Sequence, residues 1–472
     1  MSTAIVWFRR DLRLEDNPAL DAAVRQHERV ICTYIHAPDE EVPWMPGAAS
    51  NWWLHRSLQS LDSSLRKRGS SLLIRHGASL ATLARLCRDS GAVAVYWNRN
   101  YEPVPAKRDA MIKQALRADG IDAQSFNANL LAEPRDVQTQ QAGPYKVFTP
   151  FWRSLRAQLE PRPPLPAPAR IAAPSLDGSV ELDALKLLPS IRWDAGFHAQ
   201  WQPGEAGAHA LLERFIDDAL VDYSQGRDLP AEQLTSRLSA HLHFGEIGPQ
   251  QIAWRLLGED RPRSERGRTA AEGFLREIGW REFSQHLLHH FPHTTLRNLN
   301  AQFDHFAWAK DDPGALALWQ RGRTGVPLVD AGMRQLWATG WMHNRVRMVV
   351  ASFLTKNLRQ HWQHGARWFW DTLVDADLGN NTQGWQWTAG TGADAAPYFR
   401  IFNPVSQGER FDPQGDYVRR WVPELARVAA PLVHQPWRDA ALLRRTGYPQ
   451  PMVDLRESRE TALAAYRDMR AT

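Results

Sequence analysis

The chain has few of the features that would suggest a secreted, membrane-spanning or metal-dependent protein. Its 472 residues include only two cysteines, Cys32 and Cys87, which are too few for a disulfide framework and form no CxxC pair for a metal. No apolar run approaches the roughly 18 residues that indicate a membrane-spanning helix. The first ten residues also lack the charged-then-apolar order of a secretory signal. We therefore expect a cytoplasmic protein of about two or three domains, with both cysteines buried as inert thiols.

The first 130 residues alternate short apolar runs with longer amphipathic runs, which is typical of an α/β domain. Helical periodicity is present at residues 52–66 and 80–89. Five runs are expected to be strands, at residues 5–8, 30–35, 72–75, 92–97 and 123–126. Strands separated by helices form a parallel sheet wound on both faces. No GxGxxG motif follows the first strand, so a dinucleotide is not expected to bind there.

The remainder is expected to be a linker followed by a larger helical domain. Residues 131–205 lose the alternation, and residues 160–168 have the proline-rich composition of an extended, exposed connector. Beyond the linker, long helical runs follow one another without strand alternation, at residues 207–220, 273–290, 327–340 and 344–361. The expected division is therefore an α/β domain at 1–130, a linker at 131–205 and a nearly all-helical domain at 206–472.

Tryptophan is what the sequence has in excess. Ten of its 21 tryptophans fall in the segment from Trp280 to Trp387. A core that needs only apolar volume is better filled by Leu or Ile, because a buried indole needs an acceptor for its N–H group. Indoles can also stack on flat heterocycles and attract cations. Residues 261–370 carry 16 Lys and Arg against 8 Asp and Glu, which suits phosphate binding, although ordinary solvated helix faces would give the same charge.

Two groups of residues have both a chemical and a purely structural interpretation. Residues 235–239 offer hydroxyls, a guanidinium and free N–H groups at a helix start, either as an anion site or as a plain N-cap. Glu277, Trp280 and Arg281 share one helix face. They supply a carboxyl, a stacking plate and a phosphate clamp, or else a surface salt bridge beside a core indole.

A bound metal is not expected. Asp375 and Asp377 form a DxD motif, but no further carboxylate follows at calcium-loop spacing. Pairing with an arginine, or accepting hydrogen bonds from a cofactor, is favoured over metal binding. Four histidines also share a helix face without a completing Cys or carboxylate, and a proline interrupts their helix: His286, His289, His290 and His293.

Taken in order, these segments resemble the DNA photolyase and cryptochrome family over nearly the whole chain. The resemblance runs from Val6 to Pro404 and is most specific at residues 280–283, 340–345 and 375–387. Within the family the chain resembles class I cyclobutane pyrimidine dimer photolyases. This implies a deoxyribodipyrimidine photo-lyase, a carbon–carbon lyase that binds DNA, flips the dimer out of the duplex and repairs it with an electron from light-excited, reduced FAD.

Two alternatives to repair are open. The first is a cryptochrome, a blue-light photoreceptor with the same flavin and no repair activity. The second is a light-independent flavoprotein or DNA-binding module in which the tryptophans are core residues. An amide at Asn381, near the flavin N5, favours the reduced flavin of the repair enzymes. We expect a monomer that acts on DNA containing pyrimidine dimers.

The resemblance also implies roles for individual residues. FAD phosphates would be held by Tyr223, Thr235, Ser236, Arg237, Leu238 and Ser239. The isoalloxazine would meet Phe274, Asn381, Asp377, and Asp375 with its partner Arg347. Damaged DNA would contact Arg227, Glu277, Trp280, Arg281, Asn344, Arg345, Met348, Trp387 and Gln407. An electron would reach the flavin through Trp308, Trp362 and Trp385. Glu102 would contact an antenna chromophore, methenyltetrahydrofolate being expected and a deazaflavin being the alternative.

Four of these residues refine the expectation. Asn344 and Met348 stand where enzymes for (6-4) photoproducts are expected to carry histidines, which disfavours that lesion. Glu277 can donate a hydrogen bond to a thymine carbonyl only when protonated, so we expect it to be buried. Phe274 stands where the family is expected to have a tryptophan, which removes one polar contact but keeps an aromatic ring.

Overall fold

The computed structural model describes residues 2–395 and 399–471, which form two compact units. The sheet unit comprises Met1–Trp193, His198–Val221 and Ser236–Pro292. The helical unit comprises Asp194–Phe197, Asp222–Thr235 and His293–Thr472. No helix in the described part of the chain is both long and apolar enough to cross a membrane.

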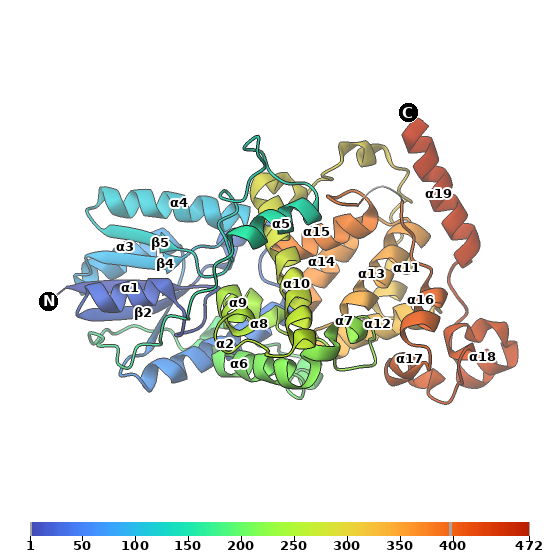
Figure 1. Ribbon diagram of the computed structural model, residues 1–472, viewed down its shortest axis with the longest axis horizontal. Coiled ribbons are helices and arrows are strands. Elements are labelled where there is room, and N and C mark those ends of the chain that lie inside the picture. Colours follow the sequence, from blue (N-terminus) through green and yellow to red (C-terminus); the bar gives the residue numbers. More distant parts are fainter. Residues whose placement is uncertain (1, 396–398, 472) are drawn as a thin grey trace. The chain divides into compact units, whose positions relative to one another are not determined.

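The sheet unit is built on a five-stranded parallel sheet in the order β3-β2-β1-β4-β5 (Figure 1). Its strands are β1 Thr3–Phe8, β2 Arg29–His36, β3 Leu72–His76, β4 Ala94–Asn98 and β5 Asp122–Phe126. Every residue of β1 and β4 is buried, as is typical of a parallel sheet covered on both faces. The expected doubly wound sheet is confirmed, and each strand begins and ends within two residues of its expected bounds.

Four helices connect the strands: α1 Pro18–Gln26, α2 Ala48–Arg66, α3 Ser79–Ser90 and α4 Pro103–Ala118. The core between helices and sheet includes Trp7 and Trp97, whose rings meet edge to face at 6.0 Å. Cys32 and Cys87 are free and buried, as expected. Burial raises the pKa of the Cys87 thiol to about 11, so this thiol is unreactive at neutral pH.

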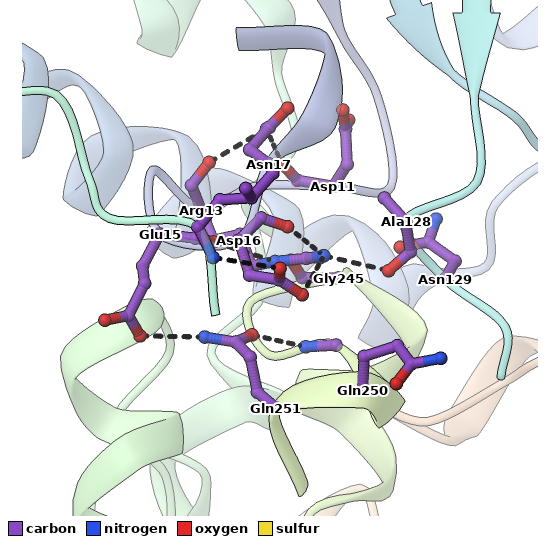
Figure 2. Close-up of polar contacts among 12 residues, drawn as sticks. Asp11, Arg13, Glu15, Asp16, Asn17, Ala128, Asn129, Gly245, Gln250 and Gln251 are labelled. Atoms are coloured by element: carbon purple, nitrogen blue, oxygen red, sulfur yellow. Dashed lines mark hydrogen bonds and ion pairs between the residues drawn. The ribbon is translucent and has the colours of Figure 1, made fainter. Parts of the chain in front are cut away.

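A fully buried arginine ties the loop after β1 to later parts of the same unit (Figure 2). The Arg13 guanidinium donates to the carbonyl oxygens of Gly245 at 2.9 Å and of Asp16 and Ala128 at 2.8 Å each. Burial lowers the pKa of Arg13, and these acceptors replace the lost water. Because such contacts hold residues 236–292 to the sheet, the two units do not coincide with the expected domain boundary near residue 206.

The expected linker contains a helix, α5, which runs over Phe148–Gln158. Phe148, Phe151 and Leu155 form its buried face, and α5 packs against α10, Glu265–His290. The proline-rich residues 160–168 have no helix or strand, as their composition predicts. The other helices of this unit are α6 Glu205–Arg214, α8 Ser239–His243 and α9 Pro249–Leu257.

The helical unit contains no strand among its described residues. Its helices are α7 Tyr223–Gly226, α11 Pro313–Gln320, α12 Pro327–Thr339, α13 Asn344–Ser352, α14 Trp362–Thr372, α15 Leu378–Ala389, α16 Pro404–Phe411, α17 Asp416–Trp421, α18 Ala440–Thr446 and α19 Leu455–Ala471. The expected run 344–361 is α13 followed by a π-helical turn, Phe353–Asn357. Helix α15 packs against α14 at Gly365, where a Cβ atom would lie 2.0 Å from the Trp385 ring.

Candidate functional site

One face of α10 in the sheet unit presents the predicted stacking residue. Gly273, Glu277 and Trp280 follow one another at helical spacing on this face, and all three are half-buried. The Trp280 ring stacks on Phe148 of α5 with centroids 3.6 Å apart and planes 11° apart. No described atom lies within 4 Å of a Cβ placed on Gly273. The expectation that Glu277 is buried is therefore wrong, because its side chain lies half-buried on this face of the helix.

The neighbouring Arg281 points into the protein. Its Nη1 donates to the carbonyl oxygen of Asn129 at 2.7 Å and pairs with the Glu282 carboxylate at 3.2 Å. Glu282 is buried and accepts the backbone N–H of Leu131 at 2.8 Å. These contacts do not support the phosphate-clamp role predicted for Arg281, since its guanidinium already holds the segment after β5 against α10.

Burial raises the pKa of Glu282 to about 7, and the Arg281 charge and backbone N–H donors only partly oppose this rise. The folded chain therefore binds this proton more tightly than the unfolded chain, so stability falls as pH rises from about 4.5 to 7. We expect Glu282→Gln to gain roughly 1–3 kcal/mol relative to wild type over that window. Thermal melting at several pH values measures the gain, with Glu272→Gln on the exposed side of α10 as control. A difference in Tm that is independent of pH would contradict the assignment.

The predicted phosphate loop, residues 235–239, carries an arginine whose side chain packs on an aromatic ring. Arg237 has a left-handed backbone, with φ at 54°, and its guanidinium lies 4.3 Å from the centre of the Trp201 ring. Burial, reinforced by the Arg214 charge, lowers the pKa of Arg237 to about 10. Thr235 and Ser236 are half-buried, Leu238 is buried and Ser239 is exposed. A guanidinium fixed beside hydroxyls is suited to binding an anion.

The aromatic residues expected to contact FAD, Phe274 at the isoalloxazine and Tyr223 at the phosphates, occur in different units. Phe274 is buried on α10 and packs on Phe215 at 4.5 Å. Tyr223 is buried at the start of α7 in the helical unit. Each ring is thus held in its own unit by packing.

In the helical unit, the start of α15 collects the predicted polar residues. Arg347 Nη2 binds both carboxylate oxygens of Asp375, at 2.8 and 3.1 Å, so the expected ion pair forms. Asp377 is the N-cap of α15 and accepts the N–H of Asn380 at 2.8 Å. The Asn381 amide donates to the carbonyl oxygen of Ala366 at 2.9 Å, which fixes its orientation.

Farther along α15, the backbone at one position is not covered by any of the described side chains. Gly384 is exposed, and no described atom lies within 4 Å of a Cβ placed on it. The uncovered backbone at Gly384 allows another group to approach this turn of α15 closely. Arg347 thus engages the Asp375 carboxylate, and the backbone N–H of Asn380 engages that of Asp377.

Trp387, near the end of α15, is half-buried and held by the loop that follows. Its Nε1 donates to the carbonyl oxygen of Asp394 at 3.2 Å. The Arg400 guanidinium lies 5.3 Å from the centre of its ring, and Phe402 lies 6.4 Å away at a tilt of 31°. A small hollow is lined by Trp387, Thr388, Gly390, Asp394, Ala395, Arg400 and Phe402. One side of the Trp387 ring is therefore packed against the protein, and the other side is partly open.

The three tryptophans of the predicted electron path become more exposed toward Trp308. Trp385 and Trp362 are buried, whereas Trp308 is half-buried. Trp362 Nε1 donates to the side chain of Asn298 at 2.9 Å. The His361 ring lies 5.6 Å from Trp362 and 4.9 Å from Trp308, a bridging position that the sequence did not indicate. This order suits a path with one end at solvent.

Sequence spacing also missed a second pair of indoles. Trp337 of α12 and Trp368 of α14 stack in parallel, with centroids 6.1 Å apart and planes 7° apart. Trp337 is 53 % exposed, so this pair lies at the surface of the helical unit.

The other predicted DNA contacts of the helical unit differ in how free they are. Asn344 is exposed at the start of α13, and Met348, one turn on, is half-buried. Arg345 binds the Asp228 carboxylate at 2.7 Å and lies over the Phe411 ring. Arg227 lies over the Tyr223 ring at 5.4 Å, and Gln407 is half-buried on α16. Arg345 is thus held both by a carboxylate and by an aromatic ring.

Glu102, predicted to contact an antenna, precedes α4 at the carboxyl end of the sheet. It is buried and ion-paired with Arg10, which also binds Glu41 at 2.9 Å. Ligands of open parallel sheets bind at this edge, where the strand order reverses between β1 and β4.

The comparisons with known proteins agree with this geometry. The family described as DNA photolyase matches residues 4–169, and the FAD binding domain of DNA photolyase matches residues 274–468. The deoxyribodipyrimidine photo-lyase of Agrobacterium fabrum is 48% identical over 99% of this chain and 98% of its own length. That of Escherichia coli is 40% identical over 99% and 98%, and cryptochrome-1 of Arabidopsis thaliana is 41% identical over 97% and 69%. The chain belongs to the DNA photolyase and cryptochrome family, and it carries that family's FAD-binding domain.

Two solved structures are similar over nearly their whole lengths. A bacterial class III photolyase from Agrobacterium tumefaciens has a TM-score of 0.95 and 47% identity, covering 100% of this chain and 98% of that chain. An archaeal photolyase from Sulfolobus tokodaii, described with two FAD molecules, has a TM-score of 0.84 and 31% identity, covering 99% and 100%. The first is described as class III, so the class I assignment made from the sequence stays a prediction.

Proposed function

We propose that this chain is a deoxyribodipyrimidine photo-lyase, which uses light to split cyclobutane pyrimidine dimers in DNA. The observation that carries the proposal is that two indole rings are partly exposed and are supported by protein on one side. Trp280 and Trp387 are each half-buried and each held from behind, by Phe148 and by the loop after α15. An indole held in this way is a plate on which an unpaired base can stack, worth about 1–3 kcal/mol per base. The relatives named photo-lyase support the same reaction.

Each unit carries residues that suit one part of FAD. The Arg237 guanidinium over Trp201, with the hydroxyls of residues 235–239, suits the phosphates, while the Asp375–Arg347 pair and the Asn381 amide suit the isoalloxazine. The open space beside Gly384 admits a flat ring close to α15. When bound in its reduced form, FAD supplies the light-excited electron that opens the cyclobutane ring and takes it back afterwards.

The side chains of this protein bind and orient the dimer. A dimer stacks poorly in the duplex, so flipping it out requires less free energy than flipping an intact base, and Trp280 and Trp387 stabilise it outside the helix. The Glu277 carboxyl, when it carries a proton on Oε, donates a hydrogen bond to a thymine carbonyl whose charge grows after electron transfer. Excluding water around that carbonyl strengthens the bond, and the bound DNA covers the open face of α10.

A repair assay under blue light and in darkness tests the proposal. Reduced, FAD-loaded protein should remove dimers from an ultraviolet-damaged oligonucleotide only in light, whereas a cryptochrome would change its flavin spectrum and leave the dimers intact. Glu277→Gln should keep much of the repair yield, because its amide still donates a hydrogen bond, and Glu277→Ala should lose about ten-fold or more. Wild-type protein that leaves dimers intact in light would refute the function. Equal yields in the three proteins would remove only Glu277.

Three further properties belong to the same proposal. We place the protein in the cytoplasm as a monomer, and we assign methenyltetrahydrofolate as its antenna near Glu102, with a deazaflavin as the alternative. The buried Arg10–Glu102 pair supports a polar ligand at that edge of the sheet. The absorption spectrum of the extracted chromophore distinguishes the two antennas, and sedimentation measures the oligomeric state.

A further inference from the structure

A buried lysine lies next to the loop that holds Trp387. Lys356 is part of the π-helical turn Phe353–Asn357 after α13, and it is 0 % exposed. Its Nζ donates to the carbonyl oxygen of Ala389, the last residue of α15, at 2.5 Å. The same atom lies 3.2 Å from the centre of the Phe399 ring. Burial lowers the pKa of Lys356 well below its ordinary value, and the amine donates this hydrogen bond in either protonation state.

The same helical segment holds the loop at a second point. Ser352, one turn before Lys356, is fully buried, and its Oγ accepts the backbone N–H of Phe402 at 3.0 Å. Lys356 and Ser352 therefore contact the loop at Phe399 and Phe402, on either side of Arg400. Arg400 is the residue whose guanidinium lies over the Trp387 ring.

Gly390 allows the turn with which the loop begins. It ends α15 in a left-handed conformation with φ at 88°. A Cβ on this residue would lie 3.4 Å from Lys356 Nζ and 3.4 Å from the Phe303 and Phe399 rings. The chain thus leaves α15 beside the lysine amine and close to two aromatic rings.

Filling this volume with a lysine has a cost in free energy. Taking an amine out of water is unfavourable unless it is hydrogen-bonded, and a Met or Leu side chain would fill the same space without that penalty. The amine adds a directed contact, because it joins the carbonyl end of α15 at Ala389 to the ring of Phe399, ten residues farther on. The last turn of α15, which carries Trp387, and residues 399–402 are therefore fixed relative to each other.

We propose that Lys356 and Ser352 are positioning residues for the damaged base: they hold the loop that orients the Trp387 indole, without touching DNA themselves. This inference rests on the proposed function, in which Trp387 stacks on the flipped dimer. Phosphate contacts give affinity for any duplex, whereas the indole acts only on a flipped base. Loosening the loop should therefore weaken the binding of damaged DNA selectively.

The test compares dark binding by full-length, FAD-loaded variants. The probes are a duplex oligonucleotide with one thymine cyclobutane dimer and the same duplex without it. We expect the Kd for the damaged duplex to rise about ten-fold in Lys356→Met and about three-fold in Ser352→Ala. Affinity for the intact duplex and repair per photon at saturating damaged DNA should stay within about two-fold of wild type.

Thr355→Val is the matched control. Thr355 is as deeply buried as its neighbour Lys356, but its Oγ1 bonds within its own helix, to Ala351 at 2.8 Å. This variant should bind the damaged duplex like wild type. Lys356→Arg, which keeps a cationic donor, should recover part of the affinity lost in Lys356→Met.

Several results would overturn the inference. They are an unchanged affinity for damaged DNA in Lys356→Met and Ser352→Ala, an equal loss for intact DNA, or an equal loss in Thr355→Val. If Lys356→Met does not fold or loses FAD, Ser352→Ala decides the matter alone. Failure of the proposed function would look different, because wild-type protein would then repair no dimers in light whatever the variants bind.

Discussion

Asp375→Ala should purify with little FAD and should repair no dimers. Asp375 is buried, and its carboxylate is bound by Arg347 through two contacts, while Arg347 also donates to the carbonyl oxygen of Met342 at 2.7 Å. Removing the carboxylate leaves the partly exposed Arg347 charge unpaired, which should destabilise the protein by about 1–3 kcal/mol. The change also removes the carboxylate proposed to accept hydrogen bonds from the isoalloxazine. The ratio of flavin to protein absorbance and the Tm measure the two effects.

A double variant separates the structural loss from the loss of cofactor binding. Arg347→Met combined with Asp375→Asn removes both charges together, so stability should largely return. FAD binding should not return, since neither the carboxylate nor its orienting cation is present. A double variant that regains both would make the pair purely structural. Asp375→Ala with a full complement of FAD would contradict the proposed role directly.

The fold could be predicted from the sequence mainly where the pattern is local. The inner strands β1, β2 and β4 are short apolar runs buried on both faces, and this composition distinguishes them from the amphipathic helices between them. Helix α5 was missed because it is an eleven-residue segment inside a proline-rich region. Its stability comes from Phe148 stacking on Trp280, more than a hundred residues later. A helix that depends on such packing has little signature of its own.

The same limit applies to the candidate site. Spacing correctly placed Glu277 and Trp280 on one face of α10, but it did not show that this face is open or that Arg281 turns inward. The acceptor that turns Arg281 inward, the carbonyl oxygen of Asn129, lies in the segment after β5. The Asp375–Arg347 pair was expected only through the family resemblance, since no spacing rule links positions 28 residues apart.

Lys356 and Ser352 show what sequence cannot indicate. A lone lysine in an amphipathic run normally means a solvated position, because lysine is almost never fully buried. Only the three-dimensional arrangement brings its amine to the carbonyl end of α15 and to Phe399. Residues that act by holding other residues carry no chemical motif. Only their contacts in the folded chain, here with the loop beside Trp387, indicate their role.

Trp362→Phe should reduce light-driven reduction of the oxidised flavin to background and leave repair by chemically reduced protein unchanged. Trp362 is fully buried, and phenylalanine keeps most of its volume but is much harder to oxidise. The indole N–H bond to Asn298 is lost as well, which should lower stability by about 1 kcal/mol. Flavin absorbance under blue light, with an external electron donor, measures the first effect, and the repair assay measures the second.

Trp319→Phe is the control that makes this result specific. Trp319 is also fully buried, donates its N–H to Val350 at 3.3 Å and lies 6.2 Å from the Trp385 ring. It is not part of the predicted path, so its replacement should leave flavin photoreduction intact. Photoreduction that survives in Trp362→Phe but fails in Trp319→Phe would move the path to the other side of Trp385. Photoreduction that survives in Trp362→Phe is by itself enough to exclude Trp362 as an obligatory electron carrier. Its buried ring would then have only a packing role.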